Sequence, residues 1–174
     1  EHPYVITNDI GKDIHNMPIW ISKWLKEKYI NSKSTSNLNL PKKIFIDSSD
    51  SSQRIKKLRL IINENEVKSF LINKGFESII LGNLHFRDQI KIFNNAEIII
   101  GLHGAGFANM CFCKTGTKII EIKSNKTKKV IENLAKTNDL FYKSISCEPT
   151  KFVSENSFGQ INVSINLLKK VIED

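Results

Sequence analysis

The sequence predicts an α/β protein with a mostly parallel β-sheet, and three observations support this class. Short apolar runs rich in isoleucine, of which residues 96–100 are the clearest, have the composition of buried parallel strands. Amphipathic segments with helical spacing lie between these runs, as the right-handed crossovers of a parallel sheet require. The 174 residues show no internal repeat and no domain break, so we expect residues 1–174 to form a single domain.

The N-terminal quarter predicts an entry segment over residues 1–11, then a helix, a loop and a strand. Residues 17–30 place apolar side chains on one helical face, with a proline that the first turn tolerates. After a polar, linker-like loop at residues 31–40, residues 43–47 read as a strand that ends in a carboxylate. The hydrophilic, serine-rich residues 48–57 are expected to form a mobile or ligand-contacting loop.

The next two units repeat this order of helix and strand. An apolar segment at residues 59–62 leads to a helix with Asn63 as its N-cap and Gly75 as its stop, and two glutamates follow in the first turn. We then expect a strand at residues 76–81 and an amphipathic helix at residues 86–94.

The central stretch joins the strand at residues 96–100 to the loop Gly101-Leu-His-Gly-Ala-Gly106. Its three glycines allow tight turns and let main-chain N–H groups approach a ligand closely. A helix starting near Gly106 or Phe107 would point its N-terminus at the same place and favour an anion. Together with His103, these features predict a nucleotide or phosphate site at the carboxyl edge of the sheet.

The C-terminal third completes the alternation. Its expected elements are a turn at residues 115–116, a strand at 118–122, a helix at 127–136, an extended segment at 141–146, a linker-like stretch at 148–156 and a helix at 160–173.

Composition and charge narrow the classes of function. The formal charge of +8 favours anionic partners, but the lysines are dispersed without an arginine-rich or aromatic-interleaved stripe, so no nucleic acid is expected. No run reaches the roughly 18 apolar residues of a membrane span, and no signal peptide is recognisable. Three cysteines without zinc-like spacing predict reduced thiols in a cytoplasmic protein, with no metal site and no cofactor.

The glycine loop alone leaves several readings open. Gly101, Gly104 and Gly106 do not form the dinucleotide fingerprint, and no Gly-Lys-Ser/Thr follows as in a P-loop. A simple packing turn and a half-buried structural histidine are the alternatives to a ligand site. A serine or cysteine hydrolase is disfavoured, because no Gly-x-Ser-x-Gly motif occurs and no base partner is evident for the cysteines.

A wider set of blocks, in order along residues 43–122, resembles one family closely. The blocks are Arg59-x-x-x-Asn63-Glu64-x-Glu66, Gly75-Phe76, Leu84-x-Phe86-x-Asp-Gln89-Ile90, Phe93-x-x-Ala96, Gly101-x-His103-Gly104-Ala105-Gly106-x-x-Asn109 and Gly116-x-x-x-Ile120-Glu121-Ile122. They resemble glycosyltransferase family 61, which includes extracellular O-GlcNAc transferase, plant xylan transferases and bacterial capsular-polysaccharide enzymes.

The resemblance implies a Rossmann-like, three-layer domain that forms the C-terminal half of a GT-B glycosyltransferase. It also implies inverting, metal-independent transfer from a nucleoside-diphosphate sugar to a saccharide acceptor. It implies that Arg59 binds the diphosphate. It also implies that His103 acts catalytically by stabilising charge on the leaving diphosphate. Gly104, Ala105, Gly106 and Asn109 count as substrate-binding, and Glu121, at the end of its strand, would accept from ribose hydroxyls.

The sequence departs from the family pattern after the first strand. Family members usually carry an Ile-Ser-Arg arginine there, whereas this chain has Ile46-Asp47-Ser48, so Arg54 or Lys56 would have to replace it. We also expect a possible N-terminal acceptor domain in the full-length protein, which would hold the catalytic base. The alternative function is a non-catalytic nucleotide- or partner-binding α/β module.

Overall fold

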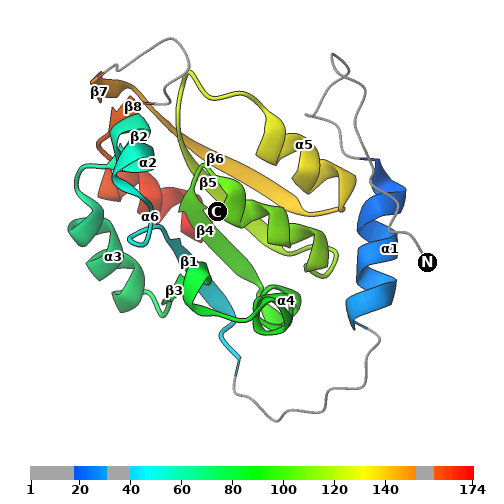
Figure 1. Ribbon diagram of the computed structural model, residues 1–174. Coiled ribbons are helices and arrows are strands. Elements are labelled where there is room, and N and C mark those ends of the chain that lie inside the picture. Colours follow the sequence, from blue (N-terminus) through cyan, green and yellow to red (C-terminus); the bar gives the residue numbers. More distant parts are fainter. Residues whose placement is uncertain (1–17, 31–39, 152–158) are drawn as a thin grey trace, which may run out of the picture.

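The computed structural model describes residues 18–30, 40–151 and 159–174, and these form a Rossmann-like α/β fold (Figure 1). The main sheet has five strands, all parallel, in the order β3-β1-β4-β5-β6. Its strands are β1 (Lys43–Asp47), β3 (Glu77–Ile80), β4 (Ile98–Leu102), β5 (Lys118–Ser124) and β6 (Phe141–Cys147). The expected α/β class with a parallel sheet is therefore confirmed.

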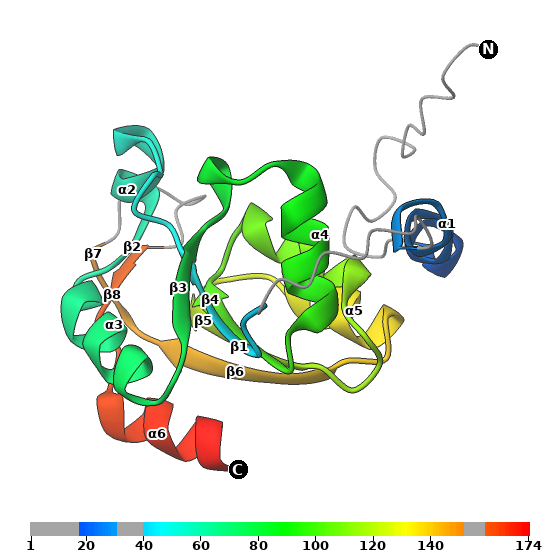
Figure 2. The ribbon, with the colours of Figure 1, turned by 90° about the horizontal axis from the view of Figure 1, so that it is seen from below.

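Helices cover both faces of this sheet, so the fold has three layers (Figure 2). One face carries α4 (Phe86–Asn95), α5 (Val130–Thr137) and the 3₁₀ helix η2 (Ala105–Phe112), with α1 (Ile19–Ile30) packed outside them. The other face carries α3 (Glu64–Asn73) and α6 (Ile165–Glu173).

Alternation along the strands explains why both faces are covered. In β4, Ile99 belongs to the core on the α4 side, and Ile100 belongs to the core on the α3 side. The same change of face occurs between Ile119 and Ile120 of β5. Continuous isoleucine runs are expected for strands buried on both sides, because each neighbouring residue then meets a different apolar layer.

A second, smaller sheet lies beside the carboxyl end of the main one, in the order β2-β8-β7. Its strands are β2 (Arg59–Ile61), β7 (Pro149–Lys151) and β8 (Gly159–Ile161). The expectation of a linker at residues 148–156 is wrong where β7 forms. The helix expected from residue 160 is also wrong at its start, because α6 begins only at Ile165.

Asn63 joins the start of α3 to the segment that follows the second sheet. It occupies the N-cap position of α3 as expected, but its side chain makes no cap hydrogen bond. Instead its Oδ1 accepts from the main-chain N–H of Val163 at 2.9 Å, and its Nδ2 donates to the Val163 carbonyl at 2.9 Å. These bonds join the start of α3 to the segment after β8, a hundred residues away.

The serine-rich residues 48–57 are not simply a loop. Gln53–Leu58 form the short helix α2, in which the Ser52 hydroxyl accepts from the N–H of Ile55 at 3.4 Å. Because α2 ends directly at Arg59, it determines where the arginine at the start of β2 lies. The predicted entry segment at residues 1–11 and most of the loop at 31–40 lie outside the described residues.

Candidate functional site

A cavity of about 180 Å³ lies at the carboxyl ends of β1 and β4. From β1 the chain first crosses to β3 on one side and then returns to β4 on the other, so this is the point where the strand order reverses. Open parallel sheets bind ligands at such switch points, because the loops after the two strands diverge there. The lining residues are Ile46, Asp47, Ser48, Asp50, Ser51, Arg59, Leu81, Leu102, His103, Gly104, Ala105 and Gly106.

Arg59 approaches the glycine loop closely. A Cβ placed on Gly104 would lie 2.8 Å from Nη2 of Arg59, so the guanidinium occupies the space that a side chain would need. Burial lowers the pKa of this guanidinium. Among the described residues no carboxylate forms an ion pair with it. An arginine held in this way is suited to bind an anion in the cavity.

The loop also places main-chain N–H groups at the same cavity, because Ala105 and Gly106 line it. The expected helix near Gly106 is the 3₁₀ helix η2, which begins at Ala105. Its first hydrogen bond runs from the N–H of Phe107 to the Gly104 carbonyl at 3.2 Å, so the N–H groups of Ala105 and Gly106 precede the helical ladder. Donors in this position favour a negatively charged ligand.

Gly106 has a packing role as well. A Cβ there would lie 3.0 Å from Cγ2 of Ile46 and 3.1 Å from Cδ1 of Leu81, so the loop lies tightly against the ends of neighbouring strands. The packing-turn interpretation of the loop and the ligand-site interpretation are therefore compatible.

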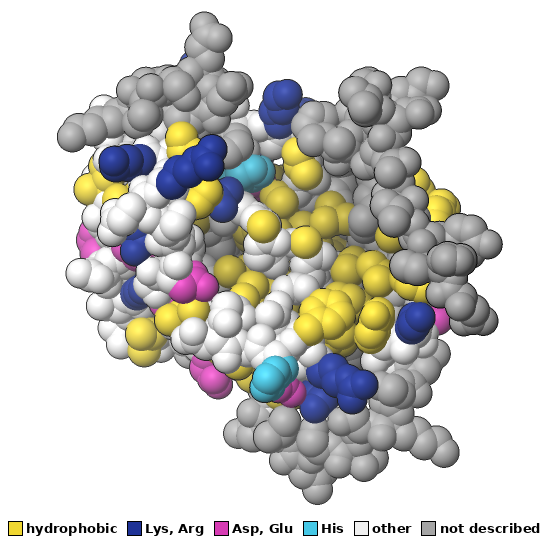
Figure 3. All heavy atoms as spheres, viewed as in Figure 1, with side chains coloured by type: hydrophobic (Ala, Val, Ile, Leu, Met, Phe, Trp, Pro, Cys, Tyr) yellow, Lys and Arg dark blue, Asp and Glu magenta, His cyan; other side chains and the backbone are white. Residues whose placement is uncertain are grey.

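Figure 3 shows the face that bears α4 and α5. Hydrophobic side chains gather in the hollow at its middle, and Lys and Arg side chains together with a histidine lie at the edge near α2. The apolar floor and the basic edge suit a ligand that has an anionic part and a less polar part.

Asn109 is not among the described residues that line the cavity. Its Nδ2 donates to Oε1 of Gln89 at 2.8 Å, and Gln89 in turn donates to the carbonyls of Leu81 and Leu84 at 2.9 and 3.2 Å. These contacts connect η2, α4 and the turn after β3. Its substrate-binding role stays a prediction, and its visible role is to hold the loop in place.

Glu121 lies inside the sheet layer rather than at the end of its strand. That expectation was wrong, because β5 continues to Ser124 and the side chain of Glu121 is 0% exposed. One carboxylate oxygen is bonded to Nδ1 of His103, and the other accepts from the hydroxyl of Tyr142. The ammonium of Lys123 lies 3.4 Å from that second oxygen. The predicted contact with ribose remains a prediction.

Lys123 and Tyr142 contact the Glu121 carboxylate, but neither was predicted from the sequence. The Lys123 ammonium also donates to the Tyr142 hydroxyl at 3.1 Å, and it lies 5.7 Å from the centre of that ring. Burial, followed by the hydrogen bond to Glu121, raises the pKa of Tyr142. The available signal was the pattern Glu121-x-Lys123, which puts two charges on one face of an otherwise apolar strand.

Asp47 ends β1 in a saturated network. Its Oδ1 accepts from the N–H of Ser49 at 2.8 Å, and its Oδ2 accepts from the Ser78 hydroxyl at 2.8 Å and pairs with the Lys68 ammonium at 2.8 Å. Burial raises the pKa of Asp47, but the bonds from Lys68, Ser49 and Ser78 outweigh it and lower the pKa to about 2. The carboxylate therefore holds β1, β3 and α3 together.

This network predicts an acid-sensitive contribution to stability. The pKa of Asp47 is lower in the folded than in the unfolded chain, so the ionised carboxylate stabilises the fold. This contribution is complete when the pH is above the pKa of the unfolded chain, and it is lost as the pH falls from about 4 towards 2. Asp47→Asn should reduce the free energy of unfolding at pH 7 by about 2 kcal/mol and flatten its decline below pH 5. Urea unfolding between pH 7 and 3 measures both quantities.

The matched control is Glu97→Gln, which removes an exposed carboxylate 3.1 Å from Lys42 at the opposite end of the sheet. It should change the unfolding free energy by less than about 0.5 kcal/mol. If the free energy of unfolding fell as steeply with decreasing pH in Asp47→Asn as in the wild type, the role given to this network would be contradicted.

The two candidates for the missing family arginine differ in position. Lys56 donates to the Ser49 carbonyl at 2.9 Å and so steadies the loop beside the cavity. Arg54 is exposed on α2 and is not among the described residues that line the cavity. The structure therefore brings Arg59, but not Arg54, to the site.

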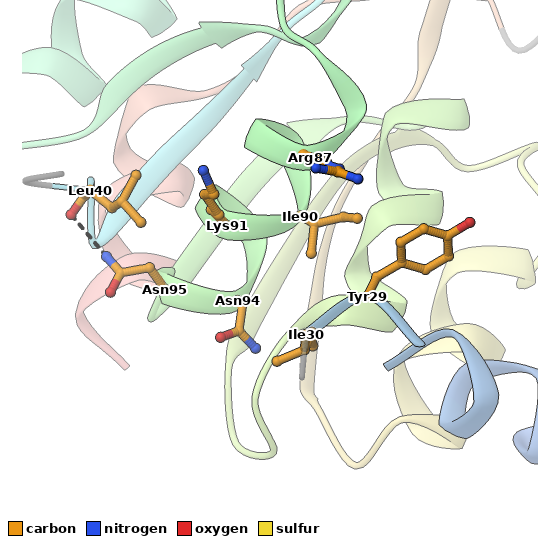
Figure 4. A pocket seen from close by; sticks show the side chains of 8 residues that line it. All are labelled: Tyr29, Ile30, Leu40, Arg87, Ile90, Lys91, Asn94 and Asn95. Atoms are coloured by element: carbon orange, nitrogen blue, oxygen red, sulfur yellow. Dashed lines mark hydrogen bonds between the residues drawn. The ribbon is translucent and has the colours of Figure 1, made fainter. Parts of the chain in front are cut away.

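A larger cavity of about 300 Å³ lies between α1 and α4 (Figure 4). We do not assign the site there, because it contains none of the predicted site residues and both of its asparagine side chains bond to the main chain of the fold. Asn94 donates to the Phe112 carbonyl at 3.0 Å, and Asn95 donates to the Leu40 carbonyl at 2.8 Å. The cavity is lined by Tyr29, Ile30, Leu40, Arg87, Ile90, Lys91, Asn94 and Asn95.

Other chemistries find no support in the part of the chain that the structure describes. Burial raises the pKa of Cys111 to about 11 and that of Cys113 to about 12, so neither is a ready thiolate nucleophile. Residues 18–30, 40–151 and 159–174 contain no cluster of three or more side chains suited to hold a metal ion. None of the helices in these ranges has the length and apolar character needed to span a bilayer.

The parallel sheet, the glycine loop after β4 and the arginine facing it define a Rossmann-like domain with a candidate anion site at its switch point. Residues 1–120 match the profile of the family Glycosyltransferase 61, which is more than half of the chain, so the chain belongs to this family. The family resemblance seen in the motifs is thereby confirmed. Glu121, Lys123 and Tyr142 lie beyond the matched residues.

Two relatives illustrate the relationship. The EGF domain-specific O-linked N-acetylglucosamine transferases of Rattus norvegicus and Pan troglodytes are 29% and 30% identical to this chain over 89 residues. The alignments cover 48% of the chain and 17% of each relative, so the chain spans only a small part of these transferases.

Proposed function

We propose that this domain binds a nucleoside-diphosphate sugar in the cavity between Arg59 and His103, as the C-terminal half of a GT-B glycosyltransferase. The observation that carries the proposal is the approach of Arg59 to Gly104 in a cavity that His103 also lines. An arginine, an imidazole and loop N–H groups together match the charge and the acceptor oxygens of a diphosphate.

The size of the cavity limits what it holds. Its volume of about 180 Å³ is below the roughly 300–1,000 Å³ of typical ligand pockets, so it suits the diphosphate better than a whole sugar nucleotide. A second domain would then contact the rest of the sugar nucleotide and the saccharide acceptor. We place the catalytic base in that domain, so the isolated chain is expected to be nearly inactive as a transferase.

In this mechanism the base removes the proton of the acceptor hydroxyl, which attacks the anomeric carbon with inversion. The bond to the diphosphate breaks, and the negative charge that develops there is stabilised by Arg59, His103 and the loop N–H groups. These groups provide the charge that makes transfer independent of a metal. The capsular-polysaccharide pathway and the cytoplasmic location belong to the same proposal.

A ligand-binding assay on the chain tests this function. UDP, GDP, CDP or dTDP at about 100 times its dissociation constant should stabilise the fold by about 2.7 kcal/mol. For a domain of this size that raises the melting temperature by roughly 5–10 °C. The shift should persist in EDTA and disappear in His103→Ala.

The control is His85→Ala, because His85 is exposed and makes no side-chain cap bond at the start of α4. It should keep the full shift. If none of the four nucleotides at millimolar concentration stabilises the wild type, the proposal fails. Binding without transfer by the full-length protein would instead support the non-catalytic binding module.

A further inference from the structure

The carboxylate of Glu121 is shared by donors from three parts of the chain. His103 follows β4, Lys123 lies on β5 with Glu121, and Tyr142 lies on the neighbouring edge strand β6. His103 bonds one carboxylate oxygen, while Tyr142 and Lys123 bond the other. The two oxygens are thus assigned to different partners.

Small residues flank Glu121 on the two neighbouring strands. Glu121 pairs in register with Gly101 of β4 and Ser144 of β6, which are small residues on either side of it. A Cβ on Gly101 would lie 3.0 Å from Cβ of Ile46 and 3.3 Å from Cζ of Phe107, so that position is filled by the core. The Glu121 carboxylate, which is 0% exposed, therefore has little freedom to turn.

This geometry determines which nitrogen of His103 carries hydrogen. A carboxylate only accepts hydrogen bonds, so Nδ1 of His103 must be the donor. Nε2 is then the nitrogen on the ring edge away from Glu121, in a side chain that lines the cavity. An oxygen of the diphosphate accepts from Nε2 only when that nitrogen carries hydrogen as well, in which case the Glu121 carboxylate balances the charge of the imidazolium.

We propose that Tyr142 and Lys123 are positioning residues for His103 and act through Glu121. By bonding the second oxygen, they keep the first oxygen directed at Nδ1 of His103. Stability alone does not account for the cluster, because apolar residues of similar volume are often as stabilising as buried ion pairs. The ligand readout of this inference rests on the proposed function, whereas its spectroscopic readout does not.

The test uses the 174-residue chain labelled with ¹⁵N-histidine. Nuclear magnetic resonance should show a protected Nδ1 proton that is absent from His103→Asn. Tyr142→Phe keeps the ring and removes only the hydroxyl, so this proton should exchange with solvent about tenfold faster. The dissociation constant of the nucleoside diphosphate that stabilises the wild type should rise about three- to tenfold.

Lys123→Met should produce the same two changes. Lys123→Arg keeps a cationic donor, so it should retain the proton exchange and the nucleotide affinity of the wild type. The matched control is Lys143→Met, which removes a lysine of β6 that pairs with Asp174 at 3.7 Å and should change neither quantity. Wild-type exchange in folded Tyr142→Phe and Lys123→Met would overturn the inference. So would weaker nucleotide binding with an unchanged Nδ1 proton, since the effect would not pass through Glu121.

The proposed function can fail separately. If no nucleotide binds to the wild type, the proposed function is wrong. Faster exchange of the His103 proton in Tyr142→Phe would still establish the positioning role in that case.

Discussion

Replacement of Glu121 by leucine is expected to lower the free energy of unfolding by about 3–5 kcal/mol at neutral pH. The substitution fills similar space but leaves His103, Lys123 and Tyr142 without their shared acceptor. Lys123 is only 8% exposed, so water cannot readily replace the lost carboxylate. Urea unfolding followed by circular dichroism measures the change.

Two variants make this result specific. Glu121→Gln keeps an acceptor oxygen and should lose less stability than Glu121→Leu. Glu132→Gln removes the negative charge that pairs with Lys136, whose side chain is 67% exposed, and should cost less than about 0.5 kcal/mol. A loss below about 1 kcal/mol in Glu121→Leu would show that the buried cluster contributes little to the fold.

Replacement of Arg59 by alanine is expected to weaken nucleoside-diphosphate binding by about 10- to 100-fold. The guanidinium is the cation that lies against the glycine loop, and hydrogen bonds between charged groups are among the strongest in proteins. Isothermal titration calorimetry with the nucleotide that stabilises the wild type measures the loss. Arg54→Ala is the matched control, because this exposed arginine of α2 does not line the cavity, and its affinity should stay within about twofold of wild type.

Gly104→Ala tests the same contact from the other side. The backbone of Gly104 is extended, with φ 170°, so alanine is compatible with the chain conformation. The new methyl group would meet Nη2 of Arg59 and displace the end of a flexible side chain. Binding should weaken while the melting temperature of the free protein stays nearly the same. Wild-type affinity in both Arg59→Ala and Gly104→Ala would exclude a role for this arginine.

Local sequence patterns were sufficient to predict most strands of the main sheet and the helices that cover it. The strand at residues 43–47 was predicted with its observed bounds, and the helices at α1, α4 and α5 were each displaced by at most three residues. The strand expected at residues 96–100 is β4 at Ile98–Leu102, a shift of two residues towards the glycine loop. Such elements follow the periodicity of their own side chains, which neighbouring residues already determine.

Elements that depend on distant partners were not predictable in the same way. β8 is a strand because Gly159–Ile161 pair in parallel with Arg59–Ile61, although the sequence from residue 160 has helical spacing. The helix α2 is short, and its capping serine, Ser52, lies in a serine-rich stretch that gives no clear helix signal. Short segments of this kind take their structure from contacts that only the folded chain provides.

The sequence by itself determined the class of the fold and the family, and it predicted Arg59 and His103 as groups suited to bind an anion. Hydrophobic periodicity and the order of motifs are properties of the amino-acid sequence, so they can be recognised before the folded structure is known. Only the tertiary structure decided that Arg59 meets Gly104, that Glu121 is buried, and that Lys123 and Tyr142 complete its coordination. The reason is that strand order and register bring together groups from three strands, and no spacing along the chain encodes those distances.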